Sequence, residues 1–271
     1  MVFFDSHCHL NDPRYDFDAE LELCAQKGVA GGVIVGTNLQ DSARALSLAR
    51  RAGERGFVFG ASCGVHPEEV EGAQGDWLDQ LQQLASDPYC VAIGEVGLDY
   101  HWQPYDPELQ KAVLTPQLEM ARQLGKPVIF HLRDCHADFW AFMEGQDPLP
   151  GAVMHCFDGS LDDALRGIEQ GWYVGFTGAV TFKRADALRA IVAALPKERL
   201  LSETDCPYMA PVPYRGKDNR PAYLPFVVEE MAKAQGLAPE TMAAQLAANG
   251  KALFGLDVTA CLSFESSRQT Q

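Results

Sequence analysis

Apolar, β-branched and aromatic residues gather in short runs along the chain, and amphipathic stretches separate these runs. Short runs of this composition are typical of buried strands. They predict eight strands, at residues 2–7, 31–36, 57–63, 90–96, 127–131, 152–156, 172–177 and 199–204. In the stretches between them, apolar residues recur at intervals of three and four, which is typical of core-facing helices. We expect such helices over 19–28, 41–53, 76–87 and 162–171, and the last helices within 221–254.

Strands that alternate with helices predict an α/β fold, and eight such units predict a single-domain TIM (β/α)8 barrel. A doubly wound open sheet is the alternative, because periodicity cannot show whether the sheet closes. We assign residues 1–256 to the barrel and expect 257–271, which is polar toward its end, to form a mobile tail. Because proline is tolerated at the first turn of a helix but not in its interior, we expect a helix to start or kink at Thr115-Pro116.

The composition, with 271 residues of which 47% are hydrophobic and 22% charged, is that of a globular protein with a sizeable core. The N-terminal stretch has no basic segment ahead of an apolar one, and no apolar run is long enough to span a bilayer. We therefore predict a cytoplasmic protein with no membrane contact and no obligate protein partner. The eight cysteines include no CxxC pair and mostly fall in or beside predicted strands, which favours free thiols in a reducing compartment.

The formal net charge of −15 limits how the protein can bind nucleic acid. A chain this acidic does not build a long basic groove along a phosphate backbone, so any nucleic acid has to be held locally.

Candidate chemistry lies at the C-terminal ends of the predicted strands. The first strand runs into DSHCHL, where alternation places Asp5, His7 and His9 on one face. The later strands end in further histidines, carboxylates and one arginine: His66, Glu95, Asp99, His131, Arg133, Asp134, His155, Glu203 and Asp205. Because loops at this end of a barrel build the active site, we expect these groups to converge.

Imidazoles and carboxylates buried together need a positive charge between them, and a divalent metal supplies one. A single strand-end histidine is more often a hydrogen-bonded core residue, but the joint placement of so many favours metal binding. We predict six ligands, namely His7, His9, Glu95, His131, His155 and Asp205. Six ligands suit two ions, with Glu95 bridging them. This donor set admits zinc, manganese, iron or magnesium.

Seven motifs then carry a family resemblance. DSHCHL, GVHPE, GEVGLDY, PVIFHLRD, MHCFDGS, SETDCPY and RGKDNRPAY, in this order and spacing, resemble the TatD family of metal-dependent hydrolases in the amidohydrolase superfamily. The form of the first motif and the NRP at 219–221 are similar to the YjjV-like branch. The resemblance implies a TIM barrel with two divalent ions and phosphodiesterase activity, with deoxyribonuclease activity reported for several members. It implies the same six ligands, and it places His66 near the substrate phosphate.

Two positions depart from the family pattern. Many relatives have NEP where this chain has Asn219-Arg220-Pro221, which puts substrate contacts on that loop in doubt. Gly250-Lys251 replaces a commoner polar pair in the last helix. Neither departure touches the predicted metal ligands.

For the mechanism we expect Asp205 to accept a proton from the attacking water, and His66 to stabilise developing charge or assist the leaving group. Glu203 either supports a ligand or is a buried carboxylate bonded to backbone. Cations and aromatic rings near the strand ends are candidates for substrate contact, with surface charge and loop packing as the ordinary alternatives. For phosphate they are Arg133, Arg215 and Lys217, and for base stacking Tyr100, Trp102 and Tyr208.

The predicted substrate is a nucleic acid strand or a small phosphodiester. One rival is a hydrolase of a cyclic amide, ester or lactone on the same barrel. Relatives of that kind commonly bridge their metals with a carbamylated lysine on the fourth strand, and this chain has no lysine between Gly75 and His101. The other rival is a binding or scaffold protein, which would have no need of six ligands.

Overall fold

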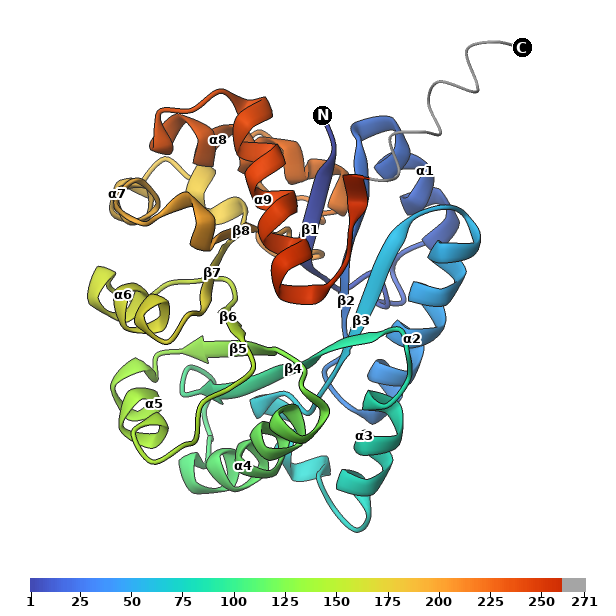
Figure 1. Ribbon diagram of the computed structural model, residues 1–271, viewed down its shortest axis with the longest axis vertical. Coiled ribbons are helices and arrows are strands. Elements are labelled where there is room, and N and C mark those ends of the chain that lie inside the picture. The colour runs from blue at the N-terminus through green and yellow to red at the C-terminus, as the bar shows by residue number, and fades with distance from the viewer. Residues whose placement is uncertain (260–271) are drawn as a thin grey trace.

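The computed structural model describes residues 1–259 of the chain. Eight parallel strands lie in sequence order in one sheet, each hydrogen-bonded to the next, as the hydrophobic runs predict (Figure 1). They are β1 Phe3–Cys8, β2 Val29–Val35, β3 Val58–Cys63, β4 Cys90–Asp99, β5 Val128–Arg133, β6 Ala152–Met154, β7 Tyr173–Phe176 and β8 Leu200–Ser202. The predicted tail lies largely outside the described residues, and the domain boundary at 256 stays a prediction.

Nine α-helices of the described residues follow and cover the strands. They are α1 Phe17–Lys27, α2 Leu39–Glu54, α3 Trp77–Ala85, α4 Pro107–Leu124, α5 His136–Met143, α6 Leu161–Glu169, α7 Asp186–Ala194, α8 Leu224–Gln235 and α9 Pro239–Phe254. Side-chain caps start several of them, such as Asp16 before α1 and the capping box of Ser160 and Asp163 at α6. None of the helices within residues 1–259 is long and apolar enough to cross a membrane.

Of the two alternatives predicted at Thr115-Pro116, the start of a helix is wrong, because α4 begins at Pro107 and continues past Pro116, and a kink there stays a prediction. Asp106 caps this earlier start by accepting hydrogen bonds from the backbone N–H groups of Glu108 and Leu109. In the turn that contains the proline, the Thr115 hydroxyl donates to the carbonyl of Lys111 at 2.8 Å. The Thr115 hydroxyl thus bonds a backbone carbonyl in the turn where Pro116, which has no N–H, interrupts the regular backbone hydrogen bonds of the helix.

The two ends of the sheet meet between β8 and β1. The Asp205 N–H donates to the carbonyl of His7 at 2.9 Å, and the His9 N–H donates to the carbonyl of Cys206 at 3.0 Å. The Ser6 hydroxyl adds a bond to the carbonyl of Ser202 at 3.1 Å. These contacts draw the sheet into a nearly closed TIM barrel, so the barrel prediction is confirmed over the open sheet.

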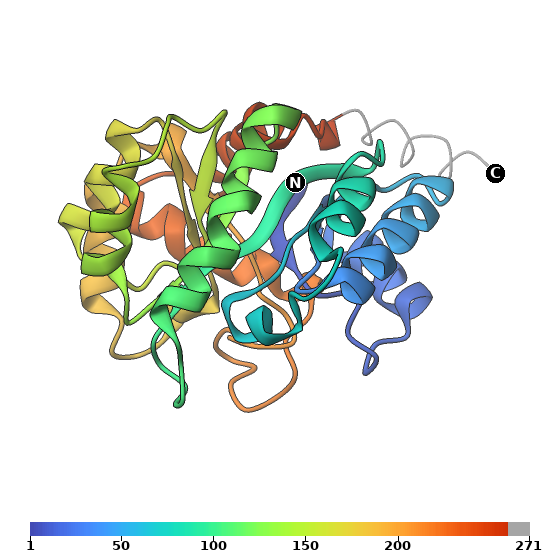
Figure 2. The ribbon, with the colours of Figure 1, turned by 90° about the horizontal axis from the view of Figure 1, so that it is seen from below.

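Apolar side chains fill one end of the barrel, and α9 covers that end. Phe4 of β1 and Leu201 of β8 pack with Ala247 and Phe254 of α9. In Figure 2 α9 lies at the top of the molecule, and the loops that follow β4 and β8 extend from the bottom. The polar strand ends therefore lie away from the end of the barrel that α9 covers.

We predict that Gly250→Ala destabilises the protein. Alanine inside a helix is normally more stable than glycine by about 0.5–1 kcal/mol. A methyl group on Gly250, however, would lie 2.4 Å from the ring of Phe4, which is buried against Phe254. We expect overpacking to cost about 1–3 kcal/mol of unfolding free energy in urea denaturation. The matched control is Gly53→Ala in α2, where the new methyl meets only ordinary contacts with Tyr89 and the expected change is neutral or stabilising.

Candidate metal centre

An open cavity of about 1250 Å³ lies over the C-terminal ends of the strands. Glu95 enters it from β4 and His131 from β5, whereas His9 and His66 enter it from the segments just after β1 and β3. His155 and Asp205 enter it just after β6 and β8. His7 lies beneath its floor and is fully buried. Most of the histidines and carboxylates singled out at the strand ends therefore come together, whereas Asp134 does not line the cavity and pairs with His101.

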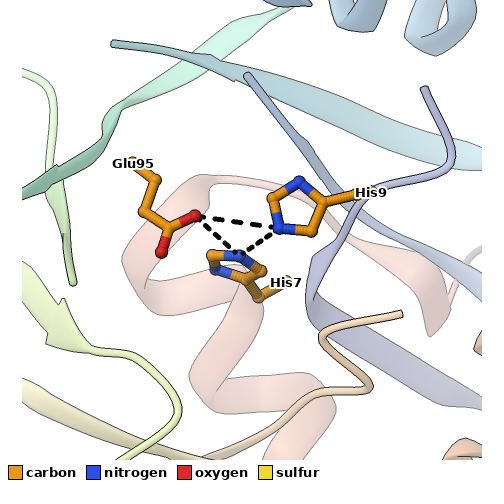
Figure 3. Close-up of side chains that lie close together, drawn as sticks. All are labelled: His7, His9 and Glu95. Atoms are coloured by element: carbon orange, nitrogen blue, oxygen red, sulfur yellow. Dashed lines mark hydrogen bonds and ion pairs between the residues drawn. The ribbon is translucent and has the colours of Figure 1, made fainter. Parts of the chain in front are cut away.

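One set of polar atoms surrounds the side of Glu95 that faces β1. The Nε2 atoms of His7 and His9 lie 3.2 Å apart, and they are 3.4 and 3.7 Å from Glu95 Oε2 (Figure 3). Asp205 Oδ1 lies 3.7 Å from His7 Nε2 and 3.5 Å from His9 Nε2. A tetrahedral ion with bonds of about 2.0–2.2 Å separates its ligand atoms by about 3.3–3.6 Å. The spacing of His7, His9 and Glu95 fits such an ion, and Asp205 lies beside the two imidazoles.

A second set surrounds the other oxygen of Glu95. His131 Nδ1 and His155 Nε2 each lie 2.7 Å from Glu95 Oε1 and are 3.3 Å from each other. His66 Nε2 lies 3.6 Å from the same oxygen. The two carboxylate oxygens of Glu95 thus face different groups of imidazoles.

Irregular strand pairing turns His7 and Glu95 toward the cavity. In β4, Ala92 faces the barrel interior and Ile93 packs in the outer layer, so simple alternation would turn Glu95 outward. The pairing of β4 with β5 shifts between Ile93 and Val96, however, and Glu95 faces inward. A similar shift in β1 between Asp5 and Cys8 brings His7 inward.

Buried carboxylates and carbonyls hold the imidazole rings from behind. Asp99 Oδ2 lies 2.8 Å from His131 Nε2, and the carbonyl of Val35 lies 3.3 Å from His9 Nδ1. Glu203 accepts the Cys156 N–H, as expected of a buried carboxylate bonded to backbone, and its Oε1 lies 3.4 Å from His155 Nδ1; its support of a metal ligand stays a prediction. Partners of this kind fix the orientation and basicity of metal-binding imidazoles.

Two further residues have definite partners. Asp5 contacts Thr204 rather than an imidazole: it accepts the Thr204 hydroxyl at 2.6 Å and N–H at 2.9 Å, and burial raises its pKa to about 8. His66 Nδ1 accepts the N–H of Glu68 at 3.1 Å. Burial lowers the pKa of His66, so the neutral ring carries its proton on Nε2, the atom that faces Glu95.

The cluster balances negative carboxylates with imidazole protons. Burial opposes ionisation of Glu95, but His155 and His7 outweigh it and hold its pKa well below the usual range. Burial also opposes protonation of His9 and His131, yet Asp205 raises the pKa of His9 to about 9, and Asp99 raises that of His131 to about 8. A divalent cation would supply the same positive charge in place of these protons. The donor types, their spacing and their charge therefore fit a metal centre.

The predicted cations differ in where they lie. Arg133 lines the cavity, and its guanidinium lies 5.4 Å from the centre of the Trp102 ring. Arg215 lies over the ring of Phe182, and Lys217 lies near the ring of Tyr214; neither side chain lines the cavity. The phosphate-binding roles of these cations stay predictions.

The predicted aromatic residues also differ. Trp102 and Tyr208 line the cavity and are largely exposed. Tyr100 instead stacks on Tyr105, and its hydroxyl bonds Asp138. Arg184, which the sequence analysis missed, lines the cavity from the segment after β7. Its position after the end of the seventh strand could have identified it as a candidate for substrate contact.

The departures from the family pattern have structural explanations. Arg220 points toward α1, with Nη1 3.6 Å from Glu20 Oε1, and does not line the cavity. Gly250 allows the close approach of α9 to Phe4. Lys251 forms an ion pair with Asp257 on the surface.

Comparison with known proteins identifies the family. The family model described as TatD related DNase matches residues 4–255. This chain belongs to the TatD-related DNase family. The family prediction made from the seven motifs is therefore confirmed, and so is the prediction of a metal-dependent hydrolase acting on ester bonds.

Several known proteins resemble this chain over nearly its full length. YcfH of Escherichia coli K12, named an uncharacterized metal-dependent hydrolase, is 38% identical and aligns over 96% of this chain and 98% of its own. The 3'-5' ssDNA/RNA exonuclease TatD of Citrobacter koseri is 37% identical over 93% of this chain and 99% of its own. The crystal structure of YJJV, a TatD homolog from E. coli K12, superposes with a TM-score of 0.86 at 33% identity, covering 93% of this chain and 98% of that one. The YjjV-like branch predicted from the sequence takes its name from this protein.

Proposed function

We propose that this TatD-family hydrolase is a phosphodiesterase that cleaves nucleic acid strands with two divalent ions, and that it acts in the cytoplasm. The observation that supports two ions is the position of Glu95, whose two oxygens face separate sets of imidazoles. His7, His9 and Asp205 would hold one ion, and His131 and His155 would hold the other. Glu95 would contribute one oxygen to each.

When bound, two divalent ions lower the pKa of a water and neutralise charge on a phosphoryl oxygen. Asp205 can accept the proton of the attacking water, because its carboxylate stays ionised: burial raises its pKa, but His9 and His155 outweigh burial and lower it. His66 can donate from Nε2 to a phosphoryl oxygen, since its Nδ1 is already an acceptor. Asp205 would therefore both hold an ion and accept a proton, whereas His66 would donate a hydrogen bond.

The choice of a nucleic acid as substrate rests on the relatives and on the cavity. The Citrobacter koseri relative is named a single-stranded DNA and RNA exonuclease. The cavity of about 1250 Å³ is open and carries arginine and exposed aromatic side chains, which suit phosphate and nucleobase. β4 carries Glu95 and no lysine, so a carbamylated-lysine bridge of the amide, ester and lactone hydrolases has no counterpart on that strand.

The first experiment is elemental analysis of the purified protein for zinc, manganese, iron and magnesium. It is paired with hydrolysis of bis-p-nitrophenyl phosphate and of a short single-stranded DNA, before and after chelation. We expect about two ions per chain, loss of both activities on chelation, and recovery when metal is returned. Metal without phosphodiester cleavage would transfer the assignment to an amide, ester or lactone hydrolase, and absence of metal under every loading condition would rule out the metal centre.

We predict that Asp99→Asn weakens metal binding without removing it. Asp99 accepts the Nε2 proton of His131, and loss of its charge reduces the basicity of the imidazole. Changes in such supporting residues typically cost about 10–100-fold in metal affinity or activity, and we expect that range in chelator-competition titrations. Asp257→Asn, which alters a surface ion pair with Lys251, is the matched control. Equal affinities for the two variants would contradict a supporting role for Asp99.

A further inference from the structure

An aromatic ring is exposed at the edge of the cavity. Trp102 follows β4, and 59% of its surface is exposed although it is one of the largest apolar side chains in the chain. By contrast, Trp140 and Trp172 are buried and stack on each other. His101, whose Nδ1 lies 2.7 Å from Asp134 Oδ2, packs perpendicular to the Trp102 ring. Its neighbours therefore position the ring and leave most of it open to a ligand.

The Trp102 ring lies beside a cation aimed into the same cavity. Arg133 is two residues beyond His131 in β5, so the two side chains share a face of the strand. Its guanidinium lies over the Trp102 ring at 5.4 Å, and it forms no ion pair within 4 Å with a carboxylate of residues 1–259. Asp158 is close enough to feel the charge of Arg133, but no carboxylate of the described residues bonds its donors, which stay available for an anion.

The charges along the cavity edge differ between its two sides. Outside the metal-binding cluster, the charged side chains that follow β1 to β3 are mostly acidic: Asp12, Asp41, Arg44, Glu68 and Glu69. Those that follow β5 to β7 are mostly basic: Arg133, Asp158 and Arg184. A polyanion is repelled from the first side and attracted to the second. The Trp102–Arg133 pair lies at the beginning of the attractive side.

We propose that Trp102 and Arg133 form a binding position for one unpaired nucleotide beside the scissile phosphodiester, with the indole stacked on the nucleobase and the guanidinium bound to its phosphate. This inference rests on the proposed phosphodiesterase function and adds a specificity determinant to it. A base inside a duplex already has its faces stacked on neighbouring bases, so only an unpaired base can occupy this position. Local binding of one nucleotide is also compatible with the net charge of −15.

The test uses the metal-loaded enzyme and a ten-residue oligothymidylate, dT10, with phosphorothioate linkages for binding and natural linkages for kinetics. We expect Trp102→Ala to weaken binding of dT10 about tenfold or more and to raise KM by a similar factor, with Trp102→Phe restoring most of the loss. Leu165→Ala, which removes an exposed apolar side chain of α6 away from the cavity, should bind dT10 like the parent enzyme. Trp102→Ala should also reduce the preference for dT10 over the dT10·dA10 duplex.

A scan of abasic residues along dT10 identifies the stacked base. At one position, loss of the base should weaken binding to the parent enzyme about tenfold, and it should have no further effect on Trp102→Ala. If the abasic and Trp102→Ala effects multiply at every position, or if Trp102→Ala binds dT10 as the parent does, the stacking position is refuted. Failure of the parent enzyme to cleave any phosphodiester is a separate result that overturns the proposed function and this inference together.

Discussion

Glu95→Gln is expected to remove both metal ions and to lower kcat/KM for bis-p-nitrophenyl phosphate by at least about 10³-fold, equivalent to about 4 kcal/mol of transition-state stabilisation. Glutamine has nearly the same shape as glutamate, so the packing around this buried position changes little. The substitution removes the negative charge, however, and replaces one carboxylate oxygen with an NH2 group that can only donate. Because each Glu95 oxygen faces its own set of imidazoles, a single change affects both proposed ion sites.

Metal content and activity should therefore fall together in Glu95→Gln. The matched control is Glu69→Gln, the same substitution at an exposed carboxylate that also lines the cavity. We expect this control to keep about two ions per chain and to stay within about threefold of the parent activity. A Glu95→Gln protein that retains both ions would show that Glu95 does not bridge them. Retention of one ion would restrict Glu95 to a single site.

The barrel and the composition of its polar end were accessible from sequence because both depend on short-range patterns. Apolar runs such as GGVIVG at 31–36 mark buried strands, and residues that directly follow a run, such as His155 after β6, must lie at one end of the sheet. Pro116 shows the limit of such rules. Its helix is stabilised by an earlier cap at Asp106 and by tertiary packing, which outweigh a local preference.

The contacts within the site depended on tertiary structure that periodicity cannot show. Alternation from Ala92 would turn Glu95 away from the cavity, and only the irregular pairing after Ile93 turns it inward. Nor does chain position reveal that Glu203 bonds both Cys156 and Ser6 behind the imidazole of His155. Nor could chain position show that the Arg215 side chain lies over the ring of Phe182, a residue that lines the cavity, rather than lining the cavity itself.

The close contact between β4 and β5 beneath the metal centre gives the largest expected effect on stability. Gly97 has φ of +151°, a conformation that side-chain-bearing residues rarely adopt, and a Cβ at this position would lie 1.9 Å from the carbonyl oxygen of His131. Gly97→Ala must therefore push β4 and β5 apart at His131. We expect a loss of about 3 kcal/mol or more of unfolding free energy in urea denaturation, from backbone strain and overpacking together.

The matched control is Gly125→Ala at the C-cap of α4, where φ is +64° and the added methyl group meets nothing within 4 Å. Backbone conformation alone then accounts for its cost, and we expect about 1 kcal/mol. Because the displaced strand carries His131, any folded Gly97→Ala protein should also bind metal more weakly, whereas Gly125→Ala should bind it normally. Equal losses of stability in the two variants would mean that backbone conformation, rather than the contact between β4 and β5, requires glycine at position 97.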